Sequence, residues 1–325
     1  MKAVKLLFVW FLLLVVLTGQ SAAAELSVSF IDVGQGDSIL VEFPCGKTIL
    51  VDAGPSSAGR PVVDYLKSRG VKALDTIVAT HPHEDHIGGM KAVLNAFPVG
   101  RFWDSGFYHG SGTQKDMLST IDERGILFFT PKAGFTEKVG DVSVSVLAPQ
   151  AGAKADSANN QSLVILIVYG KTSFLLAGDM ESQERQSVDF WPESTVLKVA
   201  HHGSFDGTDP ALLRQVKPKI AVISCGRDNP FGHPDKATLD ALQAVGAVTY
   251  VTAEVGTIVV TSNGVNVTVE TKEVKSHHVT RREDGCMLKS HVKGEPGLAL
   301  FFTKRPYVMS DVLELTKEKL GVLFV

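Results

Sequence analysis

Three histidines and an aspartate fall within six residues, directly after a segment with the pattern of a buried strand. The segment Asp75–Thr80 reads DTIVAT and is followed by HPHEDHIGG. Imidazole suits zinc and similar ions, and carboxylate widens the choice towards manganese. Alternation predicts that His81 and His83 share one side while Asp85 and His86 point elsewhere, so that one loop can serve two neighbouring ions. A solvated histidine-rich turn is the alternative interpretation.

The rest of the pattern alternates short apolar runs with helical periodicity in two successive halves. Strands are predicted over residues 26–31, 38–43, 48–52, 75–80, 142–147, 162–169, 172–177, 195–200 and 220–224. Helices are predicted over residues 60–68, 88–97, 111–125, 181–190, 210–216 and 236–245, and two final strands flank Ser262-Asn263-Gly264. Hairpins mixed with strand–helix steps predict two sheets packed face to face with helices outside, an α/β fold in the form of a four-layer αβ/βα sandwich.

The chain begins with the pattern of a secretory signal peptide. Lys2 and Lys5 precede an apolar run over residues 6–17, and Ala22-Ala23-Ala24 follows as a small-residue cleavage site. The run is shorter than the roughly 20 apolar residues that span a bilayer. We therefore expect residues 1–24 to be a signal peptide and the protein to be exported, periplasmic or extracellular. An uncleaved membrane anchor is the alternative.

Charge separates the chain into a mildly acidic body and a basic end. Cleavage would remove two lysines and take the formal net charge from −3 to −5, which gives the whole molecule no attraction for nucleic acid. Residues 272–305 instead hold eight Lys and Arg against four acids. We predict one folded domain over residues 25–271 and a basic tail or small appendage over residues 272–325. The tail either follows a phosphate backbone or is a solvated extension.

Several motifs resemble those of the metallo-β-lactamase superfamily. H-x-H-x-D-H is accompanied, in the expected order, by VDAG at 51–54, AGD at 177–179 and KVAHHGS at 198–204. DVGQGDS at 32–38, NNQSLV at 159–164 and FGHP at 231–234 resemble, more narrowly, the hydrolase domain of the competence DNA-uptake protein ComEC. The resemblance covers about residues 26–271.

The resemblance implies a ligand set for two divalent metal ions, Zn or Mn. The candidate metal ligands are His81, His83, Asp85, His86, Asp179, His201 and His202. His81 and His83 would hold the first ion, Asp85 and His86 the second, and Asp179 would bridge both. One histidine of the pair at 201–202 would complete the second site, and the pattern does not decide which.

One departure from the wider superfamily concerns the metal. Many members have a further histidine ligand where this chain has Asn159-Asn160, which leaves the first ion short of nitrogen ligands. Manganese is then as suitable as zinc. The three scattered cysteines lie in no C-x-x-C spacing, so a cysteine ligand is not expected.

Other motif residues are candidates for supporting the ligands or contacting substrate. They are Asp32, Gln35, Asp37, Asp52, Asn160 and His109. Asp52 would bond to the ligand loop. An aromatic residue in the segment 104–109 would lie at the mouth of the site, where it can stack on a base.

The implied reaction is hydrolysis. Two ions roughly 3.5–4 Å apart share a water and lower its pKa towards neutrality. Asp85, His202 and His233 are the candidate catalytic residues, with His202 or His233 as proton donor to the leaving oxygen. The resemblance implies a phosphodiester substrate such as nucleic acid. The alternatives are a hydrolase of another ester, lactone or lactam, and a non-catalytic DNA-binding component of the same fold.

Overall fold

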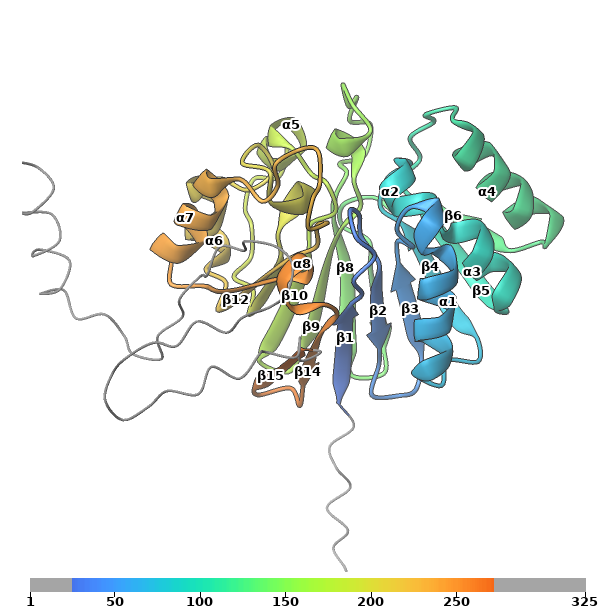
Figure 1. The fold of residues 1–325 in the computed structure, drawn as a ribbon, viewed down its shortest axis with the longest axis horizontal. Helices are drawn as coiled ribbons and strands as arrows, with labels where there is room; N and C mark the ends of the chain where they lie inside the picture. Colours follow the sequence, from blue (N-terminus) through green and yellow to red (C-terminus); the bar gives the residue numbers. More distant parts are fainter. Residues whose placement is uncertain (1–24, 272–325) are drawn as a thin grey trace, which may run out of the picture. The chain divides into compact units, whose positions relative to one another are not determined.

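Two β-sheets pack face to face in the computed structural model, which describes residues 25–271 (Figure 1). The first sheet has the spatial order β15-β14-β1-β2-β3-β4-β5-β6, and the second has the order β13-β12-β11-β10-β9-β8-β7. The strands of the first sheet are β1 (Leu26–Phe30), β2 (Ile39–Glu42), β3 (Thr48–Val51), β4 (Leu74–Ala79), β5 (Val99–Asp104), β6 (Leu127–Phe129), β14 (Ile258–Ser262) and β15 (Val267–Thr271). Those of the second are β7 (Thr136–Val139), β8 (Val142–Ala148), β9 (Val164–Tyr169), β10 (Thr172–Leu176), β11 (Val196–Lys198), β12 (Ile220–Ile223) and β13 (Val248–Val251).

Each sheet joins an antiparallel part to a parallel part. In the first sheet β14, β1, β2 and β3 are antiparallel, and β3 to β6 are parallel. In the second, β7 to β10 are antiparallel and β10 to β13 are parallel. The last hairpin returns to the first sheet, where Leu26 of β1 faces Ser262 of β14. The two predicted halves are therefore confirmed. The final hairpin, β14 and β15, pairs with the first sheet.

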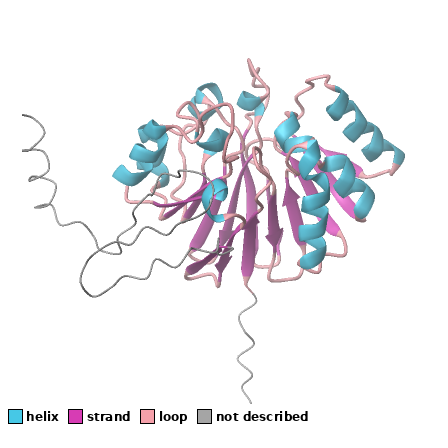
Figure 2. Ribbon diagram, in the orientation of Figure 1, coloured by secondary structure: helices cyan, strands magenta, loops and turns pink. Residues whose placement is uncertain are grey.

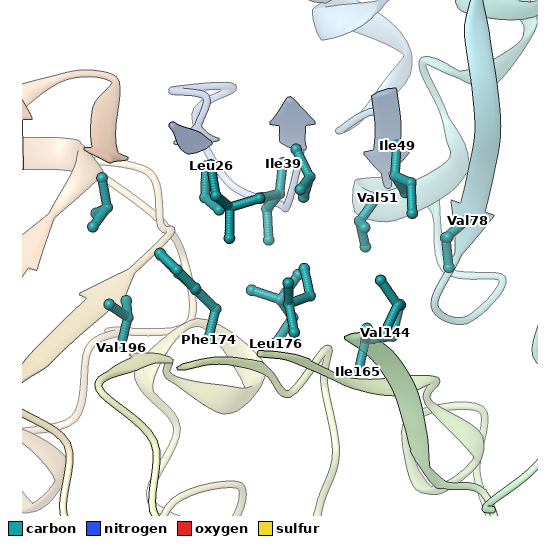
Figure 3. Close-up of a cluster of buried hydrophobic side chains, with 14 of the residues drawn as sticks. Leu26, Ile39, Ile49, Val51, Val78, Val144, Ile165, Phe174, Leu176 and Val196 are labelled. Atoms are coloured by element: carbon teal, nitrogen blue, oxygen red, sulfur yellow. The ribbon is translucent and has the colours of Figure 1, made fainter. Parts of the chain in front are cut away.

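The central core lies between the sheets. Alternate residues of β1 to β3, such as Leu26, Ile39 and Val51, face alternate residues of β8 to β10, such as Ile165 and Phe174, and all are buried (Figure 3). Burial of one face of each strand follows from its period of two. This interface holds the two halves in the mutual position that the site requires.

The helices cover the outer faces of both sheets (Figure 2). Helices α1, α3 and α4 pack on the first sheet, and α6 and α7 pack on the second. The helices are α1 (Gly59–Ser68), α2 (Glu84–Ile87), α3 (Met90–Ala96), α4 (Gly112–Glu123), α5 (Ser182–Gln186), α6 (Pro210–Val216), α7 (Lys236–Ala244) and α8 (Thr252–Val255), with 3-10 turns η1 (Ser56–Ala58), η2 (Asn159–Gln161) and η3 (Ala200–Gly203). The four-layer sandwich predicted from the sequence is confirmed.

One predicted helix is much shorter than expected. Helix α5 ends at Gln186, although helical periodicity extends over residues 181–190. The carbonyl of Arg185 accepts a hydrogen bond from the indole of Trp191, and the hydroxyl of Ser187 donates to the carbonyl of Glu184. Side chains thus take carbonyls that a longer helix would bond through its backbone.

The predicted signal peptide (1–24) and basic tail (272–325) lie outside the described residues. Within residues 25–271, no helix has the length and hydrophobicity needed to cross a bilayer.

Candidate metal centre

The candidate ligands lie in segments that follow strands of both sheets. Strand β4 of the first sheet leads through Thr80 into His81, and the short helix α2 carries Asp85 and His86. Strand β10 of the second sheet leads to Asp179, and β11 leads into the turn that holds His202. The sheet-on-sheet packing therefore assembles the site from distant parts of the chain.

Four side chains meet in one compact group. The group consists of Asp85, His86, Asp179 and His202, and the ligand atoms they offer all lie within 4.8 Å of one another. Asp179 Oδ2 is 3.2 Å from both His86 Nε2 and His202 Nε2. His202 Nε2 is also 3.1 Å from Asp85 Oδ2. Two carboxylates and two imidazoles in this arrangement form a mixed oxygen–nitrogen donor set that suits zinc or manganese.

Both imidazoles of the group are held by their other nitrogen. His86 Nδ1 lies 2.8 Å from Asp52 Oδ2, and His202 Nδ1 lies 2.9 Å from the carbonyl oxygen of Ser224. An imidazole fixed at Nδ1 presents Nε2, which is how metal-ligating histidines are usually oriented. Asp52 also accepts hydrogen bonds from the backbone and hydroxyl of Thr80, at 2.8 and 2.7 Å. Asp52 thus ties the end of β3 to the ligand loop, as the motif implied.

His81 and His83 lie together beside this group. His81 Nε2 is 3.0 Å from His83 Nδ1 and 3.8 Å from Asp179 Oδ2. His201 approaches the same carboxylate oxygen from the second sheet, with Nε2 at 3.9 Å. Asp179 Oδ2 therefore lies within 3.9 Å of His81 and His201 as well as of the two histidines of the group.

The structure distinguishes His201 from His202, between which the sequence could not choose. The His202 side chain is buried and belongs to the group of four, whereas that of His201 is 25% exposed and faces Glu181, at 3.3 Å from its Oε1. Both residues have positive φ, 47° for His201 and 54° for His202. The chain reverses through two left-handed residues, so the ordinary alternation of side chains does not apply there.

Lys198 is a site residue that sequence reasoning missed. Its side chain is fully buried in β11, and Nζ forms an ion pair with Asp37 and donates a 3.0 Å hydrogen bond to the carbonyl of Gly178. Nζ is also 3.9 Å from Asp179 Oδ1, the oxygen that faces away from the histidines. The signal in the sequence is a lysine inside the apolar run VLKVA.

In the group of four, the attraction between carboxylates and imidazoles shifts the pKa values of Asp179 and His202 more than burial does. Burial alone would raise the pKa of Asp179, but His202 and His86 hold it well below its usual value. Burial would lower the pKa of His202, yet Asp179 and Asp85 raise it to about 9. By contrast, burial and the neighbouring His86 keep the pKa of His81 well below its usual value. The carboxylates attract positive charge, and a divalent ion would compete with protons for the imidazoles.

A divalent ion fits the donors that are present. His86 Nε2 and Asp179 Oδ1 are two of the thirteen buried side-chain nitrogen and oxygen atoms within residues 25–271 that make no hydrogen bond. Buried polar atoms without a partner are uncommon and call for a ligand or another compensating group. His86 Nε2 points into the group of four, where an ion would satisfy it. The described residues therefore offer a candidate site for one ion there.

Close backbone approaches fix the ligand loops. A Cβ on Gly36 would lie 2.1 Å from the carbonyl oxygen of Asp85, and one on Gly89 would lie 2.1 Å from that of Ala53. Gly88 and Gly89 have helical φ values of −57° and −77°, so both glycines are needed for space. Gly178 has φ +53°, and its Cβ would meet Ser162 and Thr80 at 3.1 and 3.3 Å. A side chain at this position would therefore crowd the segment that leads into Asp179.

The residues of the DVGQGDS motif have different positions. Asp37 is buried against Lys198, and its backbone N–H donates to the carbonyl of Asp85 at 3.1 Å. Gln35 Oε1 accepts a hydrogen bond from the backbone of Gly226. Asp32 is exposed, and its carboxylate accepts from the N–H of Gly34. Asp37 thus supports the ligands directly, while the other two shape the loop.

Asn160 faces away from the group of four. Its amide nitrogen donates to Asp156 at 2.8 Å and to Glu181 at 3.3 Å, and its oxygen accepts from the backbone of Glu184 at 3.0 Å. Asn159 also donates to Glu181, at 2.7 Å. The two asparagines where the sequence predicted a missing histidine ligand therefore organise Glu181, which in turn faces His201.

The two outer histidines border the site. The rings of His233 and His201 lie 5.6 Å apart, and those of His109 and His83 lie 5.4 Å apart, measured between centroids. Burial and the neighbouring His201 lower the pKa of His233. The structure therefore brings both residues close to the candidate ligands, one from each sheet.

Comparison with known proteins identifies the family of the chain. The family described as the metallo-beta-lactamase superfamily matches residues 31–227. ComE operon protein 3 of Bacillus subtilis is 33% identical over 241 residues, which are 68% of this chain and 31% of that protein. Recombination protein 2 of Haemophilus influenzae is 32% identical over 225 residues, 66% of this chain and 26% of that protein. The chain therefore spans less than a third of the length of these relatives.

A solved structure shares the fold. The metallo-beta-lactamase fold protein YhfI from Bacillus subtilis superposes with a TM-score of 0.51 at 12% identity, covering 74% of this chain and all of that one. At this identity the likeness concerns the fold alone.

Proposed function

The chain belongs to the metallo-β-lactamase superfamily, and from that premise we propose that it is a metal-dependent phosphodiesterase that acts on nucleic acid. The observation that carries the proposal is the group formed by Asp85, His86, Asp179 and His202, with His81 and His83 beside it. The choice of a phosphodiester rests on the similarity to ComE operon protein 3, competence protein ComA of Neisseria gonorrhoeae and recombination protein 2.

The residues of the chain have separate roles in this proposal. Two divalent ions, when bound, supply Lewis acidity and lower the pKa of a water. Asp179 spans the two positions, since its Oδ2 is within 3.9 Å of His81, His86, His201 and His202. Asp52 and the Ser224 carbonyl keep two imidazoles in the required tautomer. Asp85 completes the second position.

His233 is proposed to contact a phosphoryl oxygen. Its ring lies beside His201 at the edge of the site, and its lowered pKa keeps the imidazole neutral at neutral pH. A neutral imidazole is a hydrogen-bond donor rather than a proton donor, so the lowered pKa favours a role in holding the substrate over protonation of the leaving oxygen.

A panel of substrates tests the proposal. Purified protein is assayed with bis-p-nitrophenyl phosphate, single-stranded DNA, nitrocefin and a lactone. We expect cleavage of the phosphodiesters alone, abolished by a chelator and restored by Mn²⁺ or Zn²⁺. Asp179→Ala is expected to lose at least a hundredfold in rate, whereas Asp64→Ala, a surface carboxylate paired with Arg60, is expected to keep wild-type activity.

Other outcomes distinguish the alternatives. Turnover of nitrocefin or the lactone without phosphodiester cleavage would identify a hydrolase of another ester or lactam. Binding of DNA without any turnover would identify a non-catalytic binding component. The choice between Zn and Mn belongs to the same experiment.

We also propose that the protein is exported through its N-terminal segment. The charged, apolar and small-residue regions of residues 1–24 support this. N-terminal sequencing of protein secreted by the native host is expected to begin at Glu25. A chain that retains Met1 in the membrane fraction would identify an uncleaved anchor.

A further inference from the structure

An exposed aromatic residue stacks on the histidine at the edge of the metal centre. The Phe231 side chain is 63% exposed, and its ring lies nearly parallel to that of His233, at 5.9 Å between centroids and an interplanar angle of 26°. The His233 ring in turn lies 5.6 Å from that of His201. The rings of His233 and Phe231 therefore lie one after the other between His201 and the protein surface.

The loop that presents Phe231 is held by one side chain. Asn229 Oδ1 accepts hydrogen bonds from the backbone N–H groups of Phe231 at 3.2 Å and His233 at 3.0 Å. Its amide nitrogen donates to the carbonyls of Gly226 at 2.9 Å and His233 at 2.6 Å. The large exposure of Phe231 is thus fixed by a braced loop. Preorganised aromatic groups bind at a lower entropic cost than mobile ones.

A cleft lies beside His233. It has a volume of about 380 Å³ and is lined by Cys225, Gly226, Arg227, His233, Pro234, Val251, Ala253 and Glu254. Arg227 is exposed, and its guanidinium donates to the carbonyl of Ala253 at 3.0 Å. Among the lining side chains, Arg227 offers a cation and Glu254 an anion. The cleft is therefore suited to a polar, largely uncharged group such as a sugar or a base.

The first sheet presents a comparable loop on its side of the centre. Tyr108 is 69% exposed, and the ring of the adjacent His109 lies 5.4 Å from that of His83. Buried Gln114 braces this loop, since its Oε1 accepts from the N–H groups of His109 and Gly110, each at 2.9 Å. Each sheet thus places an exposed aromatic residue, on a braced loop, next to a histidine that contacts the candidate ligands.

We propose that Phe231, whose ring stacks on His233, forms a stacking subsite for a nucleobase of single-stranded nucleic acid whose phosphodiester lies at the candidate metal centre. The inference rests on the proposed function and names the part of the substrate that the chain recognises. The formal net charge of −3 gives the protein little general attraction for phosphates. Stacking on an aromatic face supplies affinity without phosphate contacts and tolerates any base, since every base has a π-face.

The test compares a single-stranded oligonucleotide with a strand of the same length made of abasic residues. Both contain the same phosphodiester bonds, and only the first has bases to stack. We expect wild-type protein to have a roughly tenfold lower KM for the base-containing strand. Phe231→Ala is expected to remove this preference by raising the KM for the base-containing strand to that for the abasic strand. Phe231→Trp is expected to restore it. Phe190→Ala is the matched control, because Phe190 is also a phenylalanine and is 69% exposed.

A binding titration provides a second readout that is independent of turnover. Fluorescence anisotropy of a labelled oligonucleotide is measured in the presence of a chelator, so that nothing is cleaved. Phe231→Ala is expected to weaken binding roughly tenfold relative to wild type and to Phe190→Ala.

The outcomes separate this inference from the proposed function. Wild-type protein that cleaves both strands equally, with Phe231→Ala unchanged in cleavage and binding, would overturn the subsite and leave the phosphodiesterase standing. Wild-type protein that cleaves neither strand would contradict the phosphodiesterase, and the anisotropy titration alone would then decide the subsite. Equal binding by wild type and Phe231→Ala in that case would overturn it as well.

Discussion

At the scale of single residues, Lys198 shows how the ligand carboxylates are held. Its ammonium lies between Asp37 and Asp179 with no exposed surface, and the two carboxylates raise its pKa although burial would lower it. The lysine is therefore charged. It neutralises Asp37 and faces the outer oxygen of Asp179, so that the other oxygen of Asp179 is left to the histidines.

Replacement of this lysine tests its supporting role. Lys198→Met keeps the length of the side chain and removes the charge, which leaves Asp37 buried without its partner. Loss of one member of a buried ion pair costs about 3–5 kcal/mol. We expect a decrease of this order in the free energy of unfolding, measured with urea. Lys217→Met, which breaks an exposed pair with Glu193, is expected to cost about 1 kcal/mol or less.

A double variant identifies the partner. Adding Asp37→Asn to Lys198→Met is expected to destabilise by clearly less than the sum of the single changes, because both charges are removed together. Additive effects would show that Lys198 acts through packing alone.

Glu184 gives stability a pH dependence outside the metal ligands. Burial raises the pKa of this carboxyl to about 9, against weak opposition from the Ser162 N–H and Lys132. The folded protein binds this proton more tightly than the unfolded chain. The contribution to stability is therefore full below about pH 4.5 and is lost as the pH rises towards 9.

Glu184→Gln mimics the protonated side chain. We expect its Tm to exceed that of wild type at pH 8 by a few degrees and to equal it near pH 4. Glu123→Gln, on the exposed side of α4, is the control and is expected to follow wild type at both pH values. An equal Tm for Glu184→Gln and wild type at pH 8 would show that this carboxyl ionises without cost.

At the scale of elements, the loop between β1 and β2 determines where helix α2 lies. Gly36 has φ +130°, and a Cβ there would lie 2.1 Å from the carbonyl oxygen of Asp85. The neighbouring N–H of Asp37 donates to the same carbonyl. The loop thus contacts the backbone of a candidate ligand directly.

Gly36→Ala is expected to displace α2 and to lower both metal content and hydrolysis by at least tenfold. Gly34→Ala is the matched control, since Gly34 also has a positive φ of 74° but has open space around its Cβ position within the described residues. That change is expected to cost about 1–2 kcal/mol of stability and to leave the metal content unchanged. Equal metal content in both variants would argue against a positioning role for Gly36.

The sequence predicts the long and regularly patterned elements well and the short edge elements poorly. Helix α6 occupies residues 210–216 as predicted, because Asp209 caps it and proline begins it. Strands β6 and β13 were not predicted: all three residues of β6 are exposed, and β13 is only partly buried. Without burial on one face there is no alternation to detect. Strand β5 was not predicted either, because Gly100 and Arg101 near its start interrupt the apolar pattern.

The candidate site was predicted in part. His81, His83, Asp85 and His86 could be placed together because they are adjacent in the chain and alternate in direction. The choice of His202 over His201 could not be made, since both residues have left-handed backbones. Lys198 was missed because its partner Asp37 is in the other half of the chain. Contacts between halves depend on how the sheets pack, which local pattern does not specify.

At the scale of the whole molecule, the candidate metal centre combines side chains from the two sheets. Asp85 and His86 come from the first sheet and its helices, while Asp179 and His202 come from the second. An ion bound by all four therefore links the two halves of the sandwich. It would also neutralise the buried carboxylate of Asp179.

Removal of metal is therefore expected to lower the stability of the whole fold. A ligand present at a hundred times its Kd stabilises by about 2.7 kcal/mol. For a protein of this size, this corresponds to a decrease of roughly 5–10 °C in Tm on adding a chelator. Differential scanning calorimetry at pH 7.5 measures it. Recovery on adding Mn²⁺ or Zn²⁺ controls for irreversible unfolding, and a Tm that ignores both additions would speak against an ion between the sheets.

The number of bound ions tests most directly the claim that the candidate ligands come together to bind metal. Metal content per chain is measured by elemental analysis after reconstitution and desalting, for wild type, His83→Ala and His202→Ala. The account predicts two ions per wild-type chain and one in each variant, because each histidine serves a different position. Wild-type protein without bound metal, or variants that both retain two ions, would contradict it.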